Sequence, residues 1–281
     1  MLKQRIVTAL ILLAGLVPAM LAPDTRVFAA VCVLFVAAGG WEWGRMNQSS
    51  HGASLGMAAF VALGCVVVMI LNTVHSLLWF VWVVACGVWV LGGAWLLLAG
   101  VKAWPRVPQP LRLAIGVFAL WVCWLAVVQA RARGFNFLFS ILALVWIADI
   151  FAYFTGKALG GKFFSQKLAP AISPGKTWEG AIGGLSGVLA SAFVWRTMDQ
   201  SGLVDSPSIY TLFYAHGWAF MALASLFLGS MSVVGDLVES LFKRSAGMKD
   251  SSGLLPGHGG VLDRIDAVLP VMPLAMLIAS L

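Results

Sequence analysis

Acidic side chains that could bind a divalent metal ion recur at helical spacing in the second half of this 281-residue chain. Asp236, Glu239 and Lys243 follow at i, i+3 and i+7, so they share one face of a helix. Asp263 and Asp266 are likewise three residues apart. Carboxylate oxygens suit Mg2+, which binds one or two acids and completes its coordination with substrate phosphates. The spacing therefore predicts a metal and polyphosphate site at two helix ends.

A polar loop joins these two acidic sets and carries groups that bind phosphate. It begins at Lys243-Arg244-Ser245 and ends at His258-Gly259-Gly260, with five glycines between residues 247 and 260. Glycines let backbone N–H groups approach phosphate oxygens, and lysine and arginine offset the negative charge. His258 lies five residues before Asp263 and is the one histidine to which we assign a function. The others, His51, His75 and His216, are predicted to be loop or helix-end residues.

A second polar stretch carries four lysines and ends at Ser173-Pro174-Gly175-Lys176-Thr177-Trp178-Glu179-Gly180. The P-loop pattern G-x-x-x-x-G-K-[ST] requires a glycine where Pro170 stands and a preceding strand, which we do not expect here. We therefore reject a P-loop. Ser173, Lys176 and Thr177 could still donate to phosphate at the start of the next helix. Alternatively, Ser173 or Thr177 caps that helix and Lys176 marks a cytoplasmic loop.

Most of the acids lie where a carboxylate is costly. Seven of the eleven fall inside predicted membrane spans of the second half or at their cytoplasmic ends. A carboxylate at membrane depth costs a few kcal/mol, so it faces the bundle interior and pairs with a cation or a metal. Pairing for assembly alone would explain one such residue, but not seven beside this loop. The seven are Asp149, Glu179, Asp236, Glu239, Asp250, Asp263 and Asp266.

The elements that position these residues must be membrane helices. The chain is 61% hydrophobic and only 10% charged, which excludes a water-soluble globular protein. Its apolar stretches are long enough to cross a hydrocarbon core of about 30 Å. We predict an all-α polytopic integral membrane protein with about nine transmembrane helices. They are expected at residues 6–22, 27–41, 54–71, 76–99, 111–130, 135–155, 179–198, 212–241 and 261–281.

The basic residues predict the orientation. With the N-terminus in the cytoplasm, fourteen lysines and arginines lie inside, against Arg26, Arg131, Arg133 and Arg196 outside. This bias explains the net charge of +7 without nucleic acid as a partner. We expect a multi-pass protein of the bacterial inner membrane. N-terminal transmembrane helices occupy residues 1–134, and a C-terminal catalytic region occupies residues 135–281, with cytoplasmic loops 156–178 and 242–260 forming the active site.

The segment from 240 to 266 resembles the phosphatidate cytidylyltransferase (CDP-diacylglycerol synthase) family. The resemblance rests on Ser240-Leu241-Phe242-Lys243-Arg244, Lys249-Asp250, and Leu255 through Asp263-Arg264-Ile265-Asp266, without a gap. The segments 149–156 and 173–180 are similar to other marked regions of the family, and Trp41-Glu42-Trp43 resembles its short N-terminal hallmark. The first 130 residues agree mainly in hydrophobicity.

The resemblance implies that CTP and phosphatidic acid react to give CDP-diacylglycerol and diphosphate. It implies that Asp236 and Asp263 hold Mg2+, with K+ beside it as a further expectation. Lys249, Asp250, His258 and Asp266 join them as candidate catalytic residues. The family commonly has Ser-Pro-Lys-Lys-Thr where Gly175 stands here, so one phosphate-binding lysine is missing. The candidate substrate-binding residues are Asp149, Ser173, Lys176, Thr177, Glu179, Ser240, Lys243, Arg244, Gly259, Gly260 and Arg264.

Two other functions stay open from the residues alone. A CTP-dependent kinase of a polyprenol or similar lipid alcohol would use the same metal and nucleotide, with Asp250 or Asp266 as the base. A non-enzymatic transporter would also explain intramembrane carboxylates, but it leaves the polar loop unexplained. The expected partners are CTP, phosphatidic acid and the lipid bilayer. The apolar first half is open to two roles, a lipid entry path or a homodimer face.

Overall fold

The computed structural model describes residues 2–71 and 77–281, and it confirms an all-helical membrane architecture. Within these residues, eight helical segments are long and apolar enough to cross a membrane. The predicted residues His75 and Ser76 lie outside the described ranges. The spanning segments are α1 (Leu2–Leu21), α2 (Thr25–Met46), α3 (His51–Leu71), α4 (Leu78–Gly87) continued through a π-helical turn η2 (Val88–Gly92) into α5 (Gly93–Ala99), α6 (Gln109–Arg133), α7 (Phe135–Leu159), α8 (Trp178–Asp199) and α10 (Trp218–Ser245).

The ninth expected span, residues 261–281, is wrong as a continuous helix. It consists of α11 (Leu262–Ile265) and α12 (Val268–Ile278), broken after Asp266. Eleven residues of α12 reach about 16 Å, roughly half of a bilayer core. Its apolar side chains are buried against the other helices instead of facing lipid. Hydropathy alone does not distinguish such a buried helix from a spanning one.

The expected span 212–241 is also divided. A short helix α9 (Ile209–Tyr214) ends before Gly217, which has a positive φ of 97°, and α10 begins at Trp218. A positive φ is strained for residues with a side chain, so glycine makes this break possible. The result is a 28-residue α10 that carries apolar residues in its first part and the acidic face at its end.

The polar stretch before α8 contains the two strands of the described chain. β1 (Lys167–Ala169) pairs antiparallel with β2 (Ser173–Thr177), with Lys167 opposite Thr177 and Ala169 opposite Ser173. The sequence analysis expected no strand here, so this part of the prediction is wrong. A short 3-10 turn, η3 (Trp104–Arg106), lies in the loop between α5 and α6.

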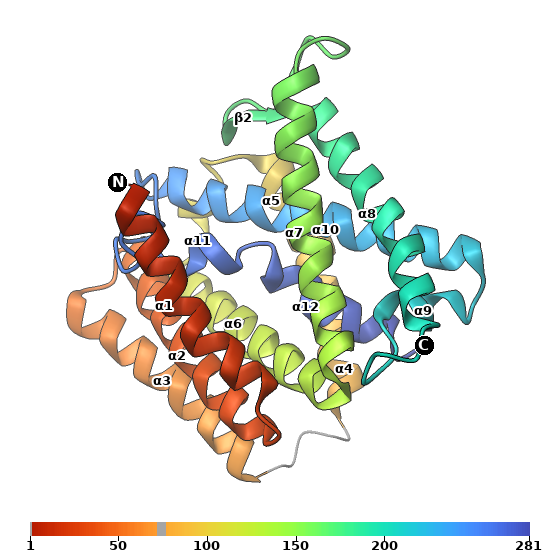
Figure 1. Cartoon of the computed structure of the whole chain (residues 1–281). Coiled ribbons are helices and arrows are strands. Elements are labelled where there is room, and N and C mark those ends of the chain that lie inside the picture. The colour runs from red at the N-terminus through yellow and green to blue at the C-terminus, as the bar shows by residue number, and fades with distance from the viewer. Residues whose placement is uncertain (1, 72–76) are drawn as a thin grey trace.

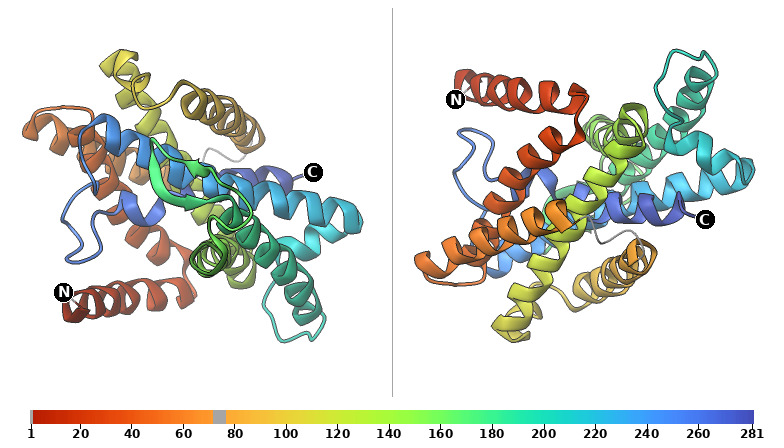
Figure 2. Two further views of the ribbon diagram at one scale, coloured as in Figure 1. Left: turned by 90° about the horizontal axis from the view of Figure 1, so that it is seen from above. Right: turned by 90° about the horizontal axis from the view of Figure 1, so that it is seen from below.

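Helix α8 packs closely against α7 through glycines. A Cβ atom on Gly184 would lie 2.7 Å from the carbonyl oxygen of Ala148, and one on Gly180 would lie 2.9 Å from that of Ala152. Small residues spaced four apart allow membrane helices to approach in this way. Figure 1 shows α7 and α8 side by side, with α10 passing across them, and Figure 2 shows the same crossing from above and below. The crossing brings the end of α10 close to the hairpin.

The connections between successive helices lie alternately at two opposite ends of the molecule. The N-terminus, the hairpin and the C-terminal end of α10 lie toward the upper left of Figure 1. The start of α7, the segment after α8 and the C-terminus lie toward the lower right. The two polar loops that the sequence analysis assigned to the active site therefore share one end of the bundle.

Candidate active site

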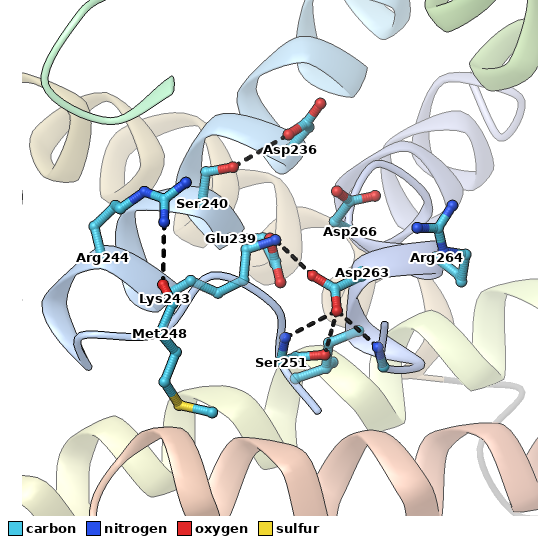
Figure 3. A network of polar contacts seen from close by, with 12 residues as sticks. Asp236, Glu239, Ser240, Lys243, Arg244, Met248, Ser251, Asp263, Arg264 and Asp266 are labelled. Atoms are coloured by element: carbon cyan, nitrogen blue, oxygen red, sulfur yellow. Dashed lines mark hydrogen bonds and ion pairs between the residues drawn. The ribbon is translucent and has the colours of Figure 1, made fainter. Parts of the chain in front are cut away.

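The acidic face of α10 forms one wall of the candidate site (Figure 3). Lys243 Nζ lies 2.6 Å from Oε2 of Glu239, one turn earlier, and 2.5 Å from Oδ1 of Asp263 on α11. Both carboxylate side chains are nearly inaccessible, so each needs a cation beside it. Lys243 therefore joins α10 to α11 and offsets two buried negative charges.

Asp263 also fixes the glycine-rich loop. Its Oδ2 accepts hydrogen bonds of 2.8 Å from Ser251 N, Ser251 Oγ and Gly260 N. Burial by itself raises the pKa of Asp263, but the Lys243 ammonium and these N–H donors outweigh it and hold the pKa below its usual value. Asp263 is thus an ionised carboxylate whose oxygens face a cation on one side and the loop on the other.

Glu42 of α2 is a second anchor of this loop, and it was absent from the predicted site residues. It is fully buried and accepts hydrogen bonds from the backbone N–H groups of Val261 and Leu262, at 2.9 and 2.8 Å. The hydroxyls of Ser251 and Ser252 donate to it as well. The available signal was Trp41-Glu42-Trp43, which resembled a family hallmark without revealing a partner 220 residues away.

The glycines of the loop serve close packing. A Cβ atom on Gly260 would lie 2.1 Å from Ser251 Oγ and 2.3 Å from Oε1 of Glu42. Gly259 has φ of +85°, which favours glycine. Because the N–H of Gly260 donates to Asp263, it is already used within the protein. The predicted role of Gly260 in binding phosphate stays a prediction.

The hairpin forms the opposite wall. Lys176 on β2 makes an ion pair with Asp236 of α10, and Ser240 Oγ donates to the other oxygen of Asp236 at 3.4 Å. Thr177 is the N-cap of α8, with Oγ1 accepting from Gly180 N at 3.0 Å. The capping alternative is therefore confirmed for Thr177, while Lys176 points to the acids. Ser173, half-buried, begins the same strand.

A cavity of about 450 Å³ lies between α7, the hairpin and the part of α10 that carries Asp236. It is lined by residues of α7, the hairpin and α10, among them Asp149, Lys176 and Asp236. Asp266 follows α11, and its pKa is raised to about 7 by burial and by the negative charges of Asp236 and Asp149. Asp149 and Asp236 both line the cavity, and their negative charges act on Asp266.

Other predicted residues have partners inside the protein. Glu179 Oε1 accepts from the N–H groups of Gly161, Phe163 and Phe164, each at 3.0 Å, and thereby holds this loop in place. Glu179 is not among the residues that line the cavity. Its predicted role in binding substrate stays a prediction. Arg244 donates to the carbonyl oxygens of Ile172 and Met248.

The remaining predicted residues lie on the glycine-rich loop and beside it. Arg264 donates to the carbonyl oxygen of His258 at 3.1 and 2.7 Å. The buried Nδ1 of His258 has no hydrogen-bond partner among the described residues. Lys249 and Asp250 are exposed. The structure therefore brings the two predicted polar loops together but distributes their residues over the cavity, the loop anchors and the surface.

The carboxylates present suit Mg2+, which takes some of its ligands from substrate, better than a metal ion whose ligands all come from the protein. Within residues 2–71 and 77–281, no group of three or more His, Cys, Asp or Glu side chains could hold a metal ion. Mg2+ needs only one or two carboxylates when substrate phosphates supply the rest. Lys176 and Lys243 pair with Asp236 and Asp263, the two carboxylates that are predicted to hold Mg2+.

Comparison with known proteins gives one consistent result. The sequence model of the cytidylyltransferase family matches residues 3–281. Phosphatidate cytidylyltransferase of Pseudomonas aeruginosa is 36% identical over 277 residues, which cover 97% of this chain and 95% of that protein. That of Haemophilus influenzae is 45% identical over 50% of this chain and 44% of its own length. That of Bacillus subtilis is 40% identical over 53% of this chain and 49% of its own length.

Proposed function

The chain belongs to the cytidylyltransferase family, and we propose that it transfers the cytidylyl group of CTP to phosphatidic acid, giving CDP-diacylglycerol and diphosphate. The observation that carries this proposal is the cavity in which Asp149 and Asp236 meet a basic hairpin at one end of an apolar helix bundle. A reaction between a polar nucleotide and a membrane lipid needs such a site, since one substrate arrives from water and the other from the bilayer.

The reaction needs no covalent intermediate with the enzyme. The phosphate monoester of phosphatidic acid is itself an anionic nucleophile that attacks the α-phosphorus of CTP, and diphosphate departs in line. The protein has to position two anions and offset their charge. We assign this work to Lys176 and Lys243, which already lie beside Asp236 and Asp263. Lys249 is exposed and able to meet the triphosphate.

Asp236 and Asp263 would hold Mg2+, which when bound polarises phosphoryl oxygens and offsets negative charge. Lys176 then exchanges its contact with Asp236 for a substrate phosphate. The unpaired Nδ1 of His258 is a buried polar atom whose desolvation is costly, and we assign it to a phosphate of the nucleotide. The K+ ion that the resemblance implies stays a prediction. The orientation that places this end of the bundle in the cytoplasm of a bacterial inner membrane follows from the basic loops.

The test uses the purified full chain in mixed micelles with phosphatidic acid, Mg2+ and CTP labelled in the cytidylyl group. Label in lipid with stoichiometric diphosphate, lost with EDTA and strongly reduced by Asp236→Asn, would establish the reaction. Asp24→Asn is the matched control, because Asp24 is an exposed acid at the start of α2. Formation of CDP in place of diphosphate would show phosphoryl transfer and overturn the proposal.

A further inference from the structure

The loop between α7 and β1 displays exposed aromatic and basic side chains that the transfer reaction leaves unused. We call the loop residues Lys162, Phe163 and Phe164, together with Lys157 at the end of α7 and Lys167 at the start of β1, the aromatic–lysine patch. Phe163 is 74% exposed and Phe164 is 42% exposed, and all three lysines are exposed. Exposed aromatic rings beside lysines are typical of segments that lie in the headgroup layer of a membrane.

The backbone of this loop is held in place although its side chains are exposed. Glu179 Oε1 accepts the N–H groups of Phe163 and Phe164, and the Phe164 ring lies 6.3 Å from that of Trp178. Figure 1 shows the loop at the tip of α7, beyond the ends of the neighbouring helices. A fixed backbone lowers the entropy cost of binding, because the rings are already held in position before a ligand binds.

The patch reaches the candidate active site. Lys157 lines the same cavity as Asp149, Lys176 and Asp236, and its Nζ lies 5.8 Å from the ring centroid of Tyr153, which also lines it. Residues 157–178 contain four lysines and no acid. A ligand bound to the patch therefore lies close to Asp236 of α10, on a segment whose only charged side chains are lysines.

We propose that the aromatic–lysine patch is an interfacial docking surface for anionic phospholipid headgroups, which gathers phosphatidic acid at the mouth of the cavity. The identity of the lipid substrate rests on the proposed function. Each lysine near an anionic membrane surface strengthens binding about fivefold, and an inserted aromatic ring gains apolar burial. CTP shares the negative charge but offers no apolar layer for Phe163, so the combination favours lipid over nucleotide.

The experiment uses the full chain in phosphatidylcholine vesicles that contain increasing fractions of phosphatidic acid, at saturating CTP. Phe163→Ser and the double variant Lys162→Gln/Lys167→Gln should each raise the apparent KM for phosphatidic acid by roughly fivefold or more. Their kcat, their KM for CTP and their activity on a dispersed short-chain phosphatidic acid should match the unsubstituted protein. Lys102→Gln and Leu203→Ser are controls, since both residues are exposed in other loops.

Two results would overturn this docking surface. One is an unchanged KM for phosphatidic acid in bilayers, and the other is a rise in KM for CTP in its place, which would assign the lysines to the nucleotide. A second readout does not depend on turnover. A polarity-sensitive dye on Phe163→Cys should shift to shorter wavelength when phosphatidic acid is added to the vesicles. Lack of turnover by the unsubstituted protein would refute the proposed function, while the dye would still decide whether the loop binds anionic lipid.

Discussion

Carboxylates of this protein do different work according to what surrounds their oxygens. Glu42 and Glu179 accept backbone N–H groups and thereby hold loops, whereas Asp149 lines the cavity. A carboxylate whose oxygens are filled by the protein's own donors has little left for a substrate or metal, and an acid facing a cavity retains that capacity. Residue type and spacing predicted where the acids gather. Which acid anchors a loop and which lines the cavity depends on hydrogen-bond donors from distant segments.

Replacing Glu42 tests the strongest of these anchors. Glu42→Ala removes the acceptor of four hydrogen bonds and leaves the N–H groups of Val261 and Leu262 and the Ser252 hydroxyl without that acceptor, while the Ser251 hydroxyl keeps its bond to Asp263. We expect roughly 2–4 kcal/mol of lost stability and a fall in kcat/KM of about a hundredfold, because the loop also carries Asp263. Thermal unfolding in detergent and the labelled-CTP assay measure both. Ser252→Ala removes one donor only and should cost far less; equal effects would disprove the anchoring role.

Lys243 is a second residue whose removal should have a large effect. Lys243→Met leaves Glu239 and Asp263 as buried acids without their shared cation. Breaking a buried ion pair by removing one partner typically costs about 3–5 kcal/mol. We expect kcat to fall at least about a hundredfold, whereas Lys249→Ala, at an exposed position, should mainly raise the KM for CTP. Kinetics at varied CTP separate these outcomes, and a normal kcat for Lys243→Met would contradict the assignment.

At the scale of elements, the site depends on the break between α11 and α12. The backbone carbonyl of Asp266 and the ring of Pro270 lie so close to α10 that a Cβ atom on Gly235 would be 2.5 Å from the former and 2.8 Å from the latter. The absent side chain at 235 therefore lets the broken helix rest directly against α10. This contact brings Asp266 next to Asp236, one residue along α10.

Gly235→Ala should separate these elements. A methyl group at that distance from a backbone atom cannot be relieved by a side-chain rotation, so α10 and α12 must move apart. Overpacking of this kind costs about 1–3 kcal/mol, and we expect kcat/KM to fall about tenfold or more as the acids move. Gly87→Ala in α4 is the control, since nothing lies within 4 Å of a Cβ atom there. Similar losses in both variants would show that helix propensity, not this contact, is responsible.

The N-terminus of α7 depends on a carboxylate at the other end of the bundle. Asp205 accepts from Phe135 N and Asn136 N at 2.6 and 2.9 Å. Partial burial raises the pKa of Asp205, but these donors outweigh it and lower the pKa below its usual value. A lowered pKa means that the contribution to stability is present above about pH 4 and is lost as the pH falls through the folded-state value.

Asp205→Asn should therefore have a pH-dependent effect. At pH 7 the variant should lose about 1 kcal/mol, the usual contribution of a helix cap. As the pH falls from about 4 through the lowered folded-state pKa of Asp205, the carboxyl becomes protonated and the difference between the two proteins should shrink. Unfolding midpoints in detergent across this pH range provide the measurement. A difference that stays constant with pH would mean that the ionised carboxylate is not the source.

At the scale of the whole molecule, hydropathy predicted the membrane architecture better than the details that make the site. The eight spanning segments lie close to predicted ranges, because apolar length alone is what a bilayer requires. The short α12 and the β hairpin were missed. A helix buried by neighbouring helices has the same composition as one facing lipid, and strand pairing over three to five residues leaves little trace in sequence. Glu42 was missed because its partners lie more than 200 residues away.

The overall arrangement also predicts which residues each side of the membrane can reach. Lys162 lies in the loop between α7 and β1, and Leu203, 90% exposed, lies in the loop after α8. Since α8 connects the two ends of the bundle, cysteines at 162 and 203 should react from opposite sides. The basic loops predict that 162 faces the cytoplasm. A membrane-impermeant maleimide should therefore label Lys162→Cys in inside-out vesicles and Leu203→Cys in intact spheroplasts.

The unsubstituted protein is the control for this labelling. Its cysteines lie within membrane helices, where Cys32, Cys65 and Cys123 are buried and Cys86 is half-buried. Labelling of Lys162→Cys from the outside would invert the whole topology and, with it, the cytoplasmic placement of the CTP site, since 162 lies in the same polar segment as Lys176. Labelling of both positions from one side would show that α8 does not cross the membrane. The first of these results would separate the nucleotide from the cavity that the proposed transfer requires.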